Sequence, residues 1–210
     1  MRCDWICLEK FRVFDSRRFE FSPGLNVIVG NNGVGKTTLL EAIGYLGRFR
    51  SFRTPRDAEV VRWGCDGFSV VGCVNGSREI RIVWDGARRV YYQGKRVQNV
   101  RELYGEFPVI VLLGEDISLV KGSPELRRRE LDALFSLIDR LYLKELVSYR
   151  RVLKQRNALL RRSAPEEQVR PWDKTFAQLA VSLSLRRRHW FSKLAHLFAE
   201  IALKFVRAKP

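Results

Sequence analysis

The sequence is poor in the side chains that build metal centres and disulfide frameworks. It has four cysteines and two histidines. Cys3, Cys7, Cys65 and Cys73 form no C-x-x-C pair, and both histidines lie far along the chain from them. This spacing argues against a zinc site and against a disulfide framework. It is typical of cysteines that act as small buried hydrophobic side chains in a reducing cytosol.

The sequence also lacks a long apolar run. Residues 1–5 do not begin the uninterrupted apolar segment of a signal peptide. In the C-terminal half the longest uncharged stretch is residues 175–185, far short of the roughly 20 residues that a bilayer requires. We therefore expect a cytoplasmic protein without a membrane span.

Acidic residues are scarce relative to basic ones. The 210 residues include 39 Lys and Arg but only 23 Asp and Glu, a formal charge of +16. Residues 1–120 hold 18 basic and 14 acidic side chains, whereas residues 121–210 hold 21 and 9. Such an excess favours an anionic partner: nucleic acid, a nucleotide or a membrane surface. Its concentration in the last ninety residues predicts a two-part molecule.

The N-terminal part has the pattern of a mixed α/β lobe. Residues 18–21 alternate like a half-buried strand, and the β-branched run at residues 25–29 is typical of a buried strand. A helix is predicted from residue 39 onward. Residues 68–92 contain three short strand patterns separated by Asn-Gly and Asp-Gly turns, which predict an antiparallel meander. Residues 107–113 predict a further buried strand.

The C-terminal part has a helical period. Ser123 is suited to cap a helix with Pro124 at its first position. Apolar residues then recur in steps of three and four over residues 131–160, stop at the polar stretch 163–168, and resume over residues 172–201. This pattern predicts two long amphipathic helices that form an antiparallel hairpin or coiled-coil arm.

Residues 30–37 match G-x-x-x-x-G-K-[ST], the phosphate-binding loop of P-loop proteins. Glycines let successive N–H groups point at a phosphate, and the following helix directs its positive end there. Lys36 is expected to reach the β- and γ-phosphates of ATP, and the Thr37 hydroxyl to bind Mg²⁺. The alternative is a plain glycine-rich turn, but the preceding β-branched run and the following helix favour the loop. The candidate cofactor-binding residues are Gly30, Asn31, Asn32, Gly33, Val34, Gly35, Lys36, Thr37 and Thr38.

Hydrolysis needs more than this loop. It also requires an acidic Mg²⁺ ligand at the end of an apolar strand. Glu115 and Asp116 follow residues 107–113, but Gly114 lies between them and shifts the carboxylates away from the strand end. Two alternatives stay open: one of the acids approaches the metal, or Asp116 caps a helix.

Arginine clusters mark the C-terminal part. Consecutive arginines on a helix point about 100° apart, so solvated helix faces are one interpretation. The other is contact with the phosphates of duplex DNA without base readout. Arg53, which follows the predicted P-loop helix, is a further candidate for sensing phosphate or DNA. The candidates in the C-terminal part are Arg127, Arg128, Arg129, Arg161, Arg162, Arg186, Arg187 and Arg188.

Several segments together closely resemble RecF proteins, ATPases of the ABC/SMC class that act in recombinational repair. The resemblance rests on residues 21–30, 32–37, 39–43, 50–54, 115–124, 127–129, 155–160 and 172–173. It implies a P-loop head with a mixed sheet at residues 1–122 and a basic helical arm at residues 123–210. It further implies binding of ATP and Mg²⁺, ATP-dependent dimerisation, binding to gapped or duplex DNA, and RecO- and RecR-like partners in loading recombinase.

The sequence departs from the RecF pattern in places. Asn31 stands where Glu is typical, Glu130 replaces an expected apolar aromatic residue, and residues 112–114 differ from the usual Phe-Ser-Pro-like stretch. No ABC signature motif and no later apolar strand with a terminal acid pair occur in the 210 residues. We therefore expect part of a larger head that binds ATP weakly and barely hydrolyses it. The alternatives are another SMC-like or overcoming-lysogenisation-type ATPase, or a nucleotide-dependent DNA-binding module without hydrolysis.

Overall fold

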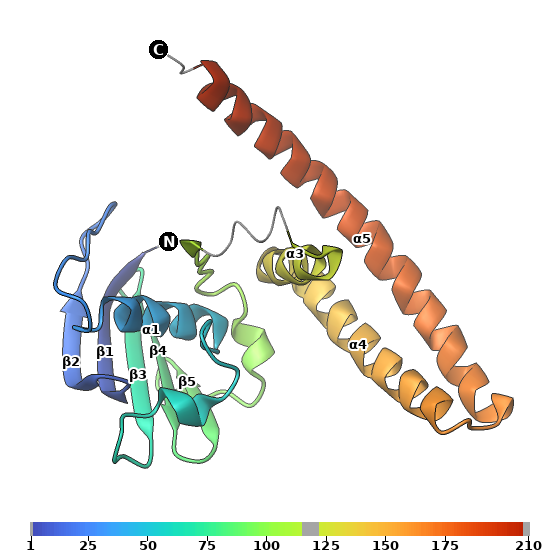
Figure 1. The fold of residues 1–210 in the computed structure, drawn as a ribbon, viewed down its shortest axis with the longest axis horizontal. Coiled ribbons are helices and arrows are strands. Elements are labelled where there is room, and N and C mark those ends of the chain that lie inside the picture. Colours follow the sequence, from blue (N-terminus) through green and yellow to red (C-terminus); the bar gives the residue numbers. More distant parts are fainter. Residues whose placement is uncertain (1, 115–121, 208–210) are drawn as a thin grey trace. The chain divides into compact units, whose positions relative to one another are not determined.

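A computed structural model describes residues 2–114 and 122–207 of the chain. The chain divides into two compact units, Met1–Asp116 and Ile117–Pro210 (Figure 1). Residues 115–121, which include the two candidate acids Glu115 and Asp116, lie outside the described part.

The first unit is built on a six-stranded sheet in the order β2-β1-β3-β4-β5-β6. The predicted meander is confirmed as β3, β4 and β5, and the turn between β3 and β4 has positive φ at Asn75 and Gly76, as a tight hairpin requires. The strand at the N-terminus, β1, was not predicted. The strands are β1 Cys3–Phe11, β2 Phe14–Glu20, β3 Phe68–Val74, β4 Arg78–Trp84, β5 Arg88–Tyr92 and β6 Lys95–Arg96.

The P-loop helix α1, Lys36–Arg48, crosses one face of this sheet (Figure 1). A Cβ added at Gly72 of β3 would lie 2.3 Å from Cδ2 of Leu46, so helix and sheet pack closely there. A Cβ added at Gly47 would lie 2.5 Å from the carbonyl oxygen of Phe107. The helix is therefore packed between the sheet and the segment around residue 107.

Two predicted buried strands are not strands in this structure. Residues 25–29 and 107–113 pair with no strand among the described residues, and Leu25 and Val29 are 88% and 83% exposed. The sheet of the described residues is antiparallel throughout, so the mixed sheet that the resemblance to RecF implied is not found among them. β-Branched runs favour an extended backbone, but a strand forms only where a neighbouring strand pairs with it.

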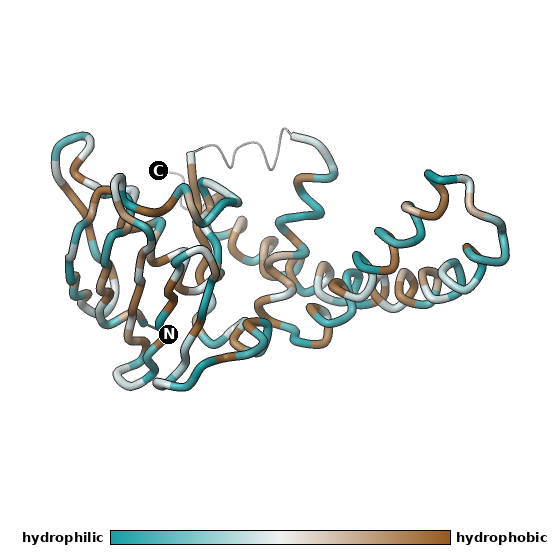
Figure 2. The backbone as a smooth tube through the Cα atoms, turned by 90° about the horizontal axis from the view of Figure 1, so that it is seen from below, coloured by the Kyte–Doolittle hydropathy of each residue, from teal (hydrophilic) through white to brown (hydrophobic). Residues whose placement is uncertain are grey.

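The second unit consists of three helices: α3 Pro124–Ile138, α4 Arg140–Arg161 and α5 Glu166–Arg207. Along these helices, hydrophobic and hydrophilic residues alternate (Figure 2). Phe135, Tyr142, Leu146 and Leu183 form the buried core of this unit. The helical hairpin is thus present as α4 and α5. Within the described residues, no helix is both long and apolar enough to cross a membrane.

The predicted continuous helix over residues 131–160 is wrong at Asp139. This residue ends α3 and begins α4 with an extended backbone, φ −133°. Its carboxylate accepts hydrogen bonds from the amides of Leu141 and Tyr142, each at 2.9 Å. The helix therefore breaks because Asp139 caps α4. The predicted Ser123 cap is confirmed, since its hydroxyl accepts from the amide of Leu126 at 3.3 Å.

Candidate nucleotide-binding site

The phosphate-binding loop has the backbone that its glycines allow. Gly33 and Gly35 adopt φ of 85° and 102°, a left-handed backbone conformation that residues with a side chain rarely adopt. A Cβ at Gly35 would also lie 2.6 Å from Cζ of Phe14 in β2. Both the backbone conformation and the lack of room for a Cβ therefore require glycine at position 35. This residue immediately precedes α1, whose first amides have no partner within the helix.

Lys36 closes the loop from the helix side. Its ammonium donates hydrogen bonds to the carbonyl oxygens of Gly30 and Asn31, each at 2.8 Å. Thr37 is exposed in the first turn of α1, whereas Thr38 is buried. The candidate residues 30–38 thus form one continuous loop and helix start, with a cation and a free hydroxyl at its mouth.

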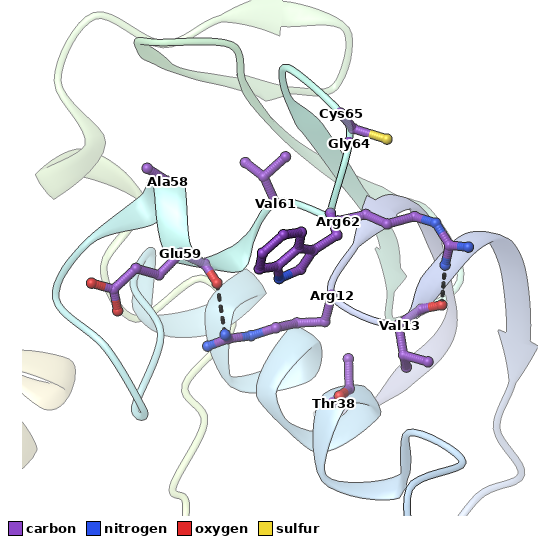
Figure 3. A pocket seen from close by; sticks show the side chains of 10 residues that line it. Arg12, Val13, Thr38, Ala58, Glu59, Val61, Arg62, Gly64 and Cys65 are labelled. Carbon is purple, nitrogen blue, oxygen red and sulfur yellow. Dashed lines mark hydrogen bonds between the residues drawn. The ribbon is translucent and has the colours of Figure 1, made fainter.

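A cavity of about 720 Å³ adjoins the start of α1. Of the candidate residues 30–38, Thr38 lines this cavity (Figure 3). Trp63 is 99% exposed and offers its indole to a ligand. Apart from Thr38, the lining was not predicted from the sequence. The other residues lining the cavity are Arg12, Val13, Ala58, Glu59, Val61, Arg62, Trp63, Gly64 and Cys65.

Backbone pairing holds the two walls of this cavity together. The amide of Arg12 donates to the carbonyl of Val60 and the amide of Arg62 to that of Lys10, each at 2.8 Å. The Arg12 guanidinium also donates to the carbonyl of Glu59 at 2.6 Å, and the Arg62 guanidinium to that of Val13 (Figure 3). The β1–β2 turn and the segment around residue 60 are therefore joined into one frame.

A buried carboxylate on α1 fixes the orientation of Arg12. Glu41 is fully buried and accepts from Nη2 and Nε of Arg12 at 2.8 and 3.2 Å. Ser51 donates to the same carboxylate at 2.5 Å, and Arg53 at 3.3 Å. Arg53, a candidate phosphate or DNA sensor, lies in the loop after the P-loop helix and is hydrogen-bonded to that helix through Glu41.

A second polar contact ties the cavity wall to α1. The Tyr45 hydroxyl donates to Asp57 at 2.7 Å, and Arg88 donates to the same carboxylate at 2.9 Å. Burial and this hydrogen bond raise the pKa of Tyr45 above its ordinary value, so the phenol stays a donor. Asp57 begins the short helix η1, Asp57–Val60, whose residues form part of the cavity wall.

The candidate arginines of the helical unit divide into two groups. Arg186 forms ion pairs with Glu145 at 2.9 Å and Asp139 at 3.3 Å, and Arg187 with Asp132 at 2.9 Å. These two guanidinium groups serve the packing of their own unit and are poor candidates for phosphate contact. The exposed candidates are Arg127, Arg128, Arg129, Arg161, Arg162 and Arg188.

Comparison with known proteins agrees with this geometry. A family model described as an AAA domain matches residues 6–162. The RecF protein of Moorella thermoacetica is 39% identical over 196 residues, which cover 90% of this chain. The chain belongs to this AAA-domain family, as a RecF-like member. The RecF protein of Heliobacterium modesticaldum is 38% identical over 204 residues. The predicted resemblance to RecF is confirmed.

The RecF-like chain spans about half the length of the curated relatives it matches, 53% and 55% of these two proteins. A solved structure of the recombination mediator protein RecF-ATP matches with a TM-score of 0.84 and 30% identity, over 91% of this chain and 54% of that one. The Smc head domain of Pyrococcus furiosus is 18% identical over 98% of this chain and 61% of its own, with a TM-score of 0.51, and shows the shared fold alone. The P-loop head fold is thus confirmed.

Proposed function

We propose that this RecF-like chain carries the ATP-binding part and a DNA-binding arm of a protein of DNA replication and recombinational repair. The observation that carries the proposal is the glycine loop closed by Lys36 beside a cavity that exposes Trp63. A solved relative is described as RecF-ATP, which supports ATP as the nucleotide. We assign the nucleotide lobe to residues 1–122 and the arm to residues 123–210.

The two parts of the site suit the two ends of ATP. The free amides at the start of α1 and the Lys36 ammonium favour the triphosphate, which carries several negative charges. The exposed Thr37 hydroxyl is suited to hold Mg²⁺, which would shield that charge. Trp63 offers a face for stacking of the base, and Arg12, which lines the same cavity, provides a guanidinium fixed by Glu41.

The arm suits a polyanion. Residues 121–210 carry 21 basic and 9 acidic side chains, and six of the candidate arginines are exposed. Contacts of arginine with phosphate are independent of base sequence, so we propose binding to duplex or gapped DNA. By analogy with RecF, we further propose RecO- and RecR-like partners in loading recombinase, and an ATP-dependent homodimer of the complete protein.

Equilibrium dialysis with labelled ATP and Mg²⁺ tests nucleotide binding. The Lys36→Ala variant should bind at least about tenfold more weakly, since it loses a charged hydrogen-bond donor to the phosphates. Lys95→Ala, on the edge strand β6, is the matched control and should bind like the wild type. Equal binding by all three proteins would contradict the assignment of the loop.

A DNA-binding module without hydrolysis is the second candidate. It shares the phosphate-binding loop and the basic helices with the first candidate and differs from it only in lacking hydrolysis. It predicts that the chain binds ATP and DNA and releases almost no phosphate. Turnover of the purified chain at the rate of its full-length relatives would exclude it. In either case the affinity for duplex DNA should fall steeply with salt, and a flat salt dependence would contradict phosphate contact.

A further inference from the structure

A second pocket lies within the helical unit, between α3 and α5. Its volume is about 230 Å³, and we call it the α3–α5 pocket. Leu131 and Phe135 of α3 and Phe191 of α5 supply its apolar surface. Phe135 belongs to the buried core, but Phe191 is 55% exposed and leaves its ring available to a ligand. Three arginines, Arg128, Arg187 and Arg188, complete the lining.

The three arginines differ in their partners. Arg187 donates to both oxygens of Asp132, at 2.9 and 3.0 Å, so its charge is compensated within the unit. Arg128 and Arg188 are exposed, and neither has an ion pair or a side-chain hydrogen bond with any residue that the structure describes. The pocket therefore combines an apolar surface with two uncompensated positive charges.

This combination selects the chemistry of the ligand. An apolar surface gains little from a sugar–phosphate backbone, whereas it is stabilised by burying a large aliphatic or aromatic side chain. The guanidinium groups favour carboxylates, which they bind with charge-assisted hydrogen bonds. A ligand that satisfies both features carries an apolar side chain next to carboxylates.

We propose that the α3–α5 pocket binds an acidic peptide segment of a partner protein. One leucine or phenylalanine of that segment enters the pocket against Phe191, and aspartates or glutamates on either side of it pair with Arg128 and Arg188. An aromatic or aliphatic anchor surrounded by charged contacts is a common arrangement at protein interfaces. The pocket is formed within the second unit and the P-loop belongs to the first, so the proposal does not depend on ATP binding.

Fluorescence anisotropy with the 210-residue chain tests the proposal. The probe is a fluorescein-labelled dodecapeptide in which a Leu-Phe pair lies between aspartates. Reversing both charges, Arg128→Glu with Arg188→Glu, should weaken binding at least about tenfold, because charge attraction becomes repulsion. Phe191→Ala should weaken it about fivefold or more through lost apolar contact. The control Arg161→Glu changes charge outside the pocket and should stay within about twofold, and Lys36→Ala should match the wild type.

Three results would overturn the proposal. A peptide with Ser-Ser in place of Leu-Phe that binds as tightly would show attraction by net charge alone. Equal weakening by Arg161→Glu would lead to the same conclusion. A DNA duplex that displaces the peptide, and whose own binding falls in the Phe191→Ala variant, would assign the pocket to DNA. Circular dichroism should confirm that the variants stay folded, as expected for the exposed residues Arg128, Arg188 and Phe191.

Discussion

Glu41 connects the P-loop helix to side chains from two other parts of the first unit. Its buried carboxylate binds Arg12 from the β1–β2 turn and Ser51 and Arg53 from the loop after α1. A buried charge is tolerated only when such partners compensate it. The residue therefore gives α1 a defined position relative to the cavity as well as to the sheet.

Glu41→Gln should lower both stability and nucleotide affinity. The amide keeps the volume but loses the charge that holds Arg12 and Arg53, and we expect a loss of about 1–3 kcal/mol in the free energy of unfolding. Urea denaturation of the chain measures this change, and ATP titration measures the effect on the cavity. Glu20→Gln, whose exposed carboxylate pairs with Arg18, should change neither. A Glu41→Gln variant as stable as the wild type would contradict this role.

The residues of the phosphate loop were predictable from sequence, but most of the cavity was not. The loop is local: its glycines, lysine and threonine are consecutive, and each has a backbone or charge requirement. Arg12, Thr38 and Trp63 come instead from three separate segments that only the fold brings together. The one available signal was Trp63 itself, an aromatic residue between an arginine and a glycine in a turn-like stretch.

At the scale of elements, α1 depends on small residues where it meets its neighbours. A Cβ at Gly47 would contact the backbone oxygen of Phe107 at 2.5 Å and Cγ2 of Val109 at 2.4 Å. A Cβ at Gly44 would meet only side chains, Phe52 and Val111, each at 3.2 Å. The space next to Gly47 is limited by a backbone atom, which cannot shift as readily as the side chains next to Gly44.

Gly47→Ala should therefore destabilise the first unit by about 1–3 kcal/mol, the usual cost of overpacking. Gly44→Ala is the matched control in the same helix. It should change stability by less, because the helix preference of alanine, about 1 kcal/mol, offsets a mild contact. Thermal unfolding followed at 222 nm compares the two variants. Equal effects, or a stabilised Gly47→Ala variant, would show that residues 107–109 do not pack on α1 as described.

Asp139 predicts a pH dependence for the helical unit. Burial raises the pKa of its carboxyl, but hydrogen bonds from the Trp190 indole and the Tyr142 and Leu141 amides, with the Arg186 charge, outweigh burial and hold the pKa below its ordinary value. A carboxyl with a depressed folded pKa contributes stability above its unfolded pKa of about 3.9, and that contribution is lost as pH falls through the folded pKa.

Asp139→Asn should accordingly lower the melting temperature at pH 7, where Asn still caps α4 but no longer pairs with Arg186. The difference from the wild type should shrink as the pH falls below about 4 and through the folded pKa, because the wild-type carboxyl then becomes protonated as well. Asp85→Asn, on the surface of the other unit, is the control. A difference that stays constant from pH 7 to pH 2 would contradict the charge-based account.

Element types were more predictable than their limits and partners. The meander and the hairpin helices follow from periodicity, because each pattern reflects the face that an element buries. The break at Asp139 was missed because apolar spacing continues across it, while the cap depends on one side chain. Residues 25–29 have the composition of a strand but no pairing neighbour among the described residues, and composition alone does not reveal a partner.

At the scale of the whole molecule, the sequence divides its charge between two units of different chemistry. The first unit has 18 basic and 14 acidic side chains up to residue 120 and contains the P-loop, whereas most of the excess of +16 belongs to the helices. This division supports our proposals that one unit holds a nucleotide and that the other binds anionic partners, DNA along the arm and an acidic peptide at the α3–α5 pocket. Nucleotide binding by the first unit can be tested separately from binding of an anionic partner by the second, because the two units share no residues.

We propose that ATP binds with its triphosphate on the loop and its base against Trp63. Isothermal titration of ATP and of inorganic tripolyphosphate, each with Mg²⁺, tests it on the wild type, Lys36→Ala and Trp63→Ala. Lys36→Ala should weaken both ligands at least about tenfold. Trp63→Ala should weaken ATP by about fivefold or more, since base stacking is worth roughly 1–3 kcal/mol, and leave tripolyphosphate unchanged. Equal loss of both ligands in Trp63→Ala, or no loss in Lys36→Ala, would contradict the claim.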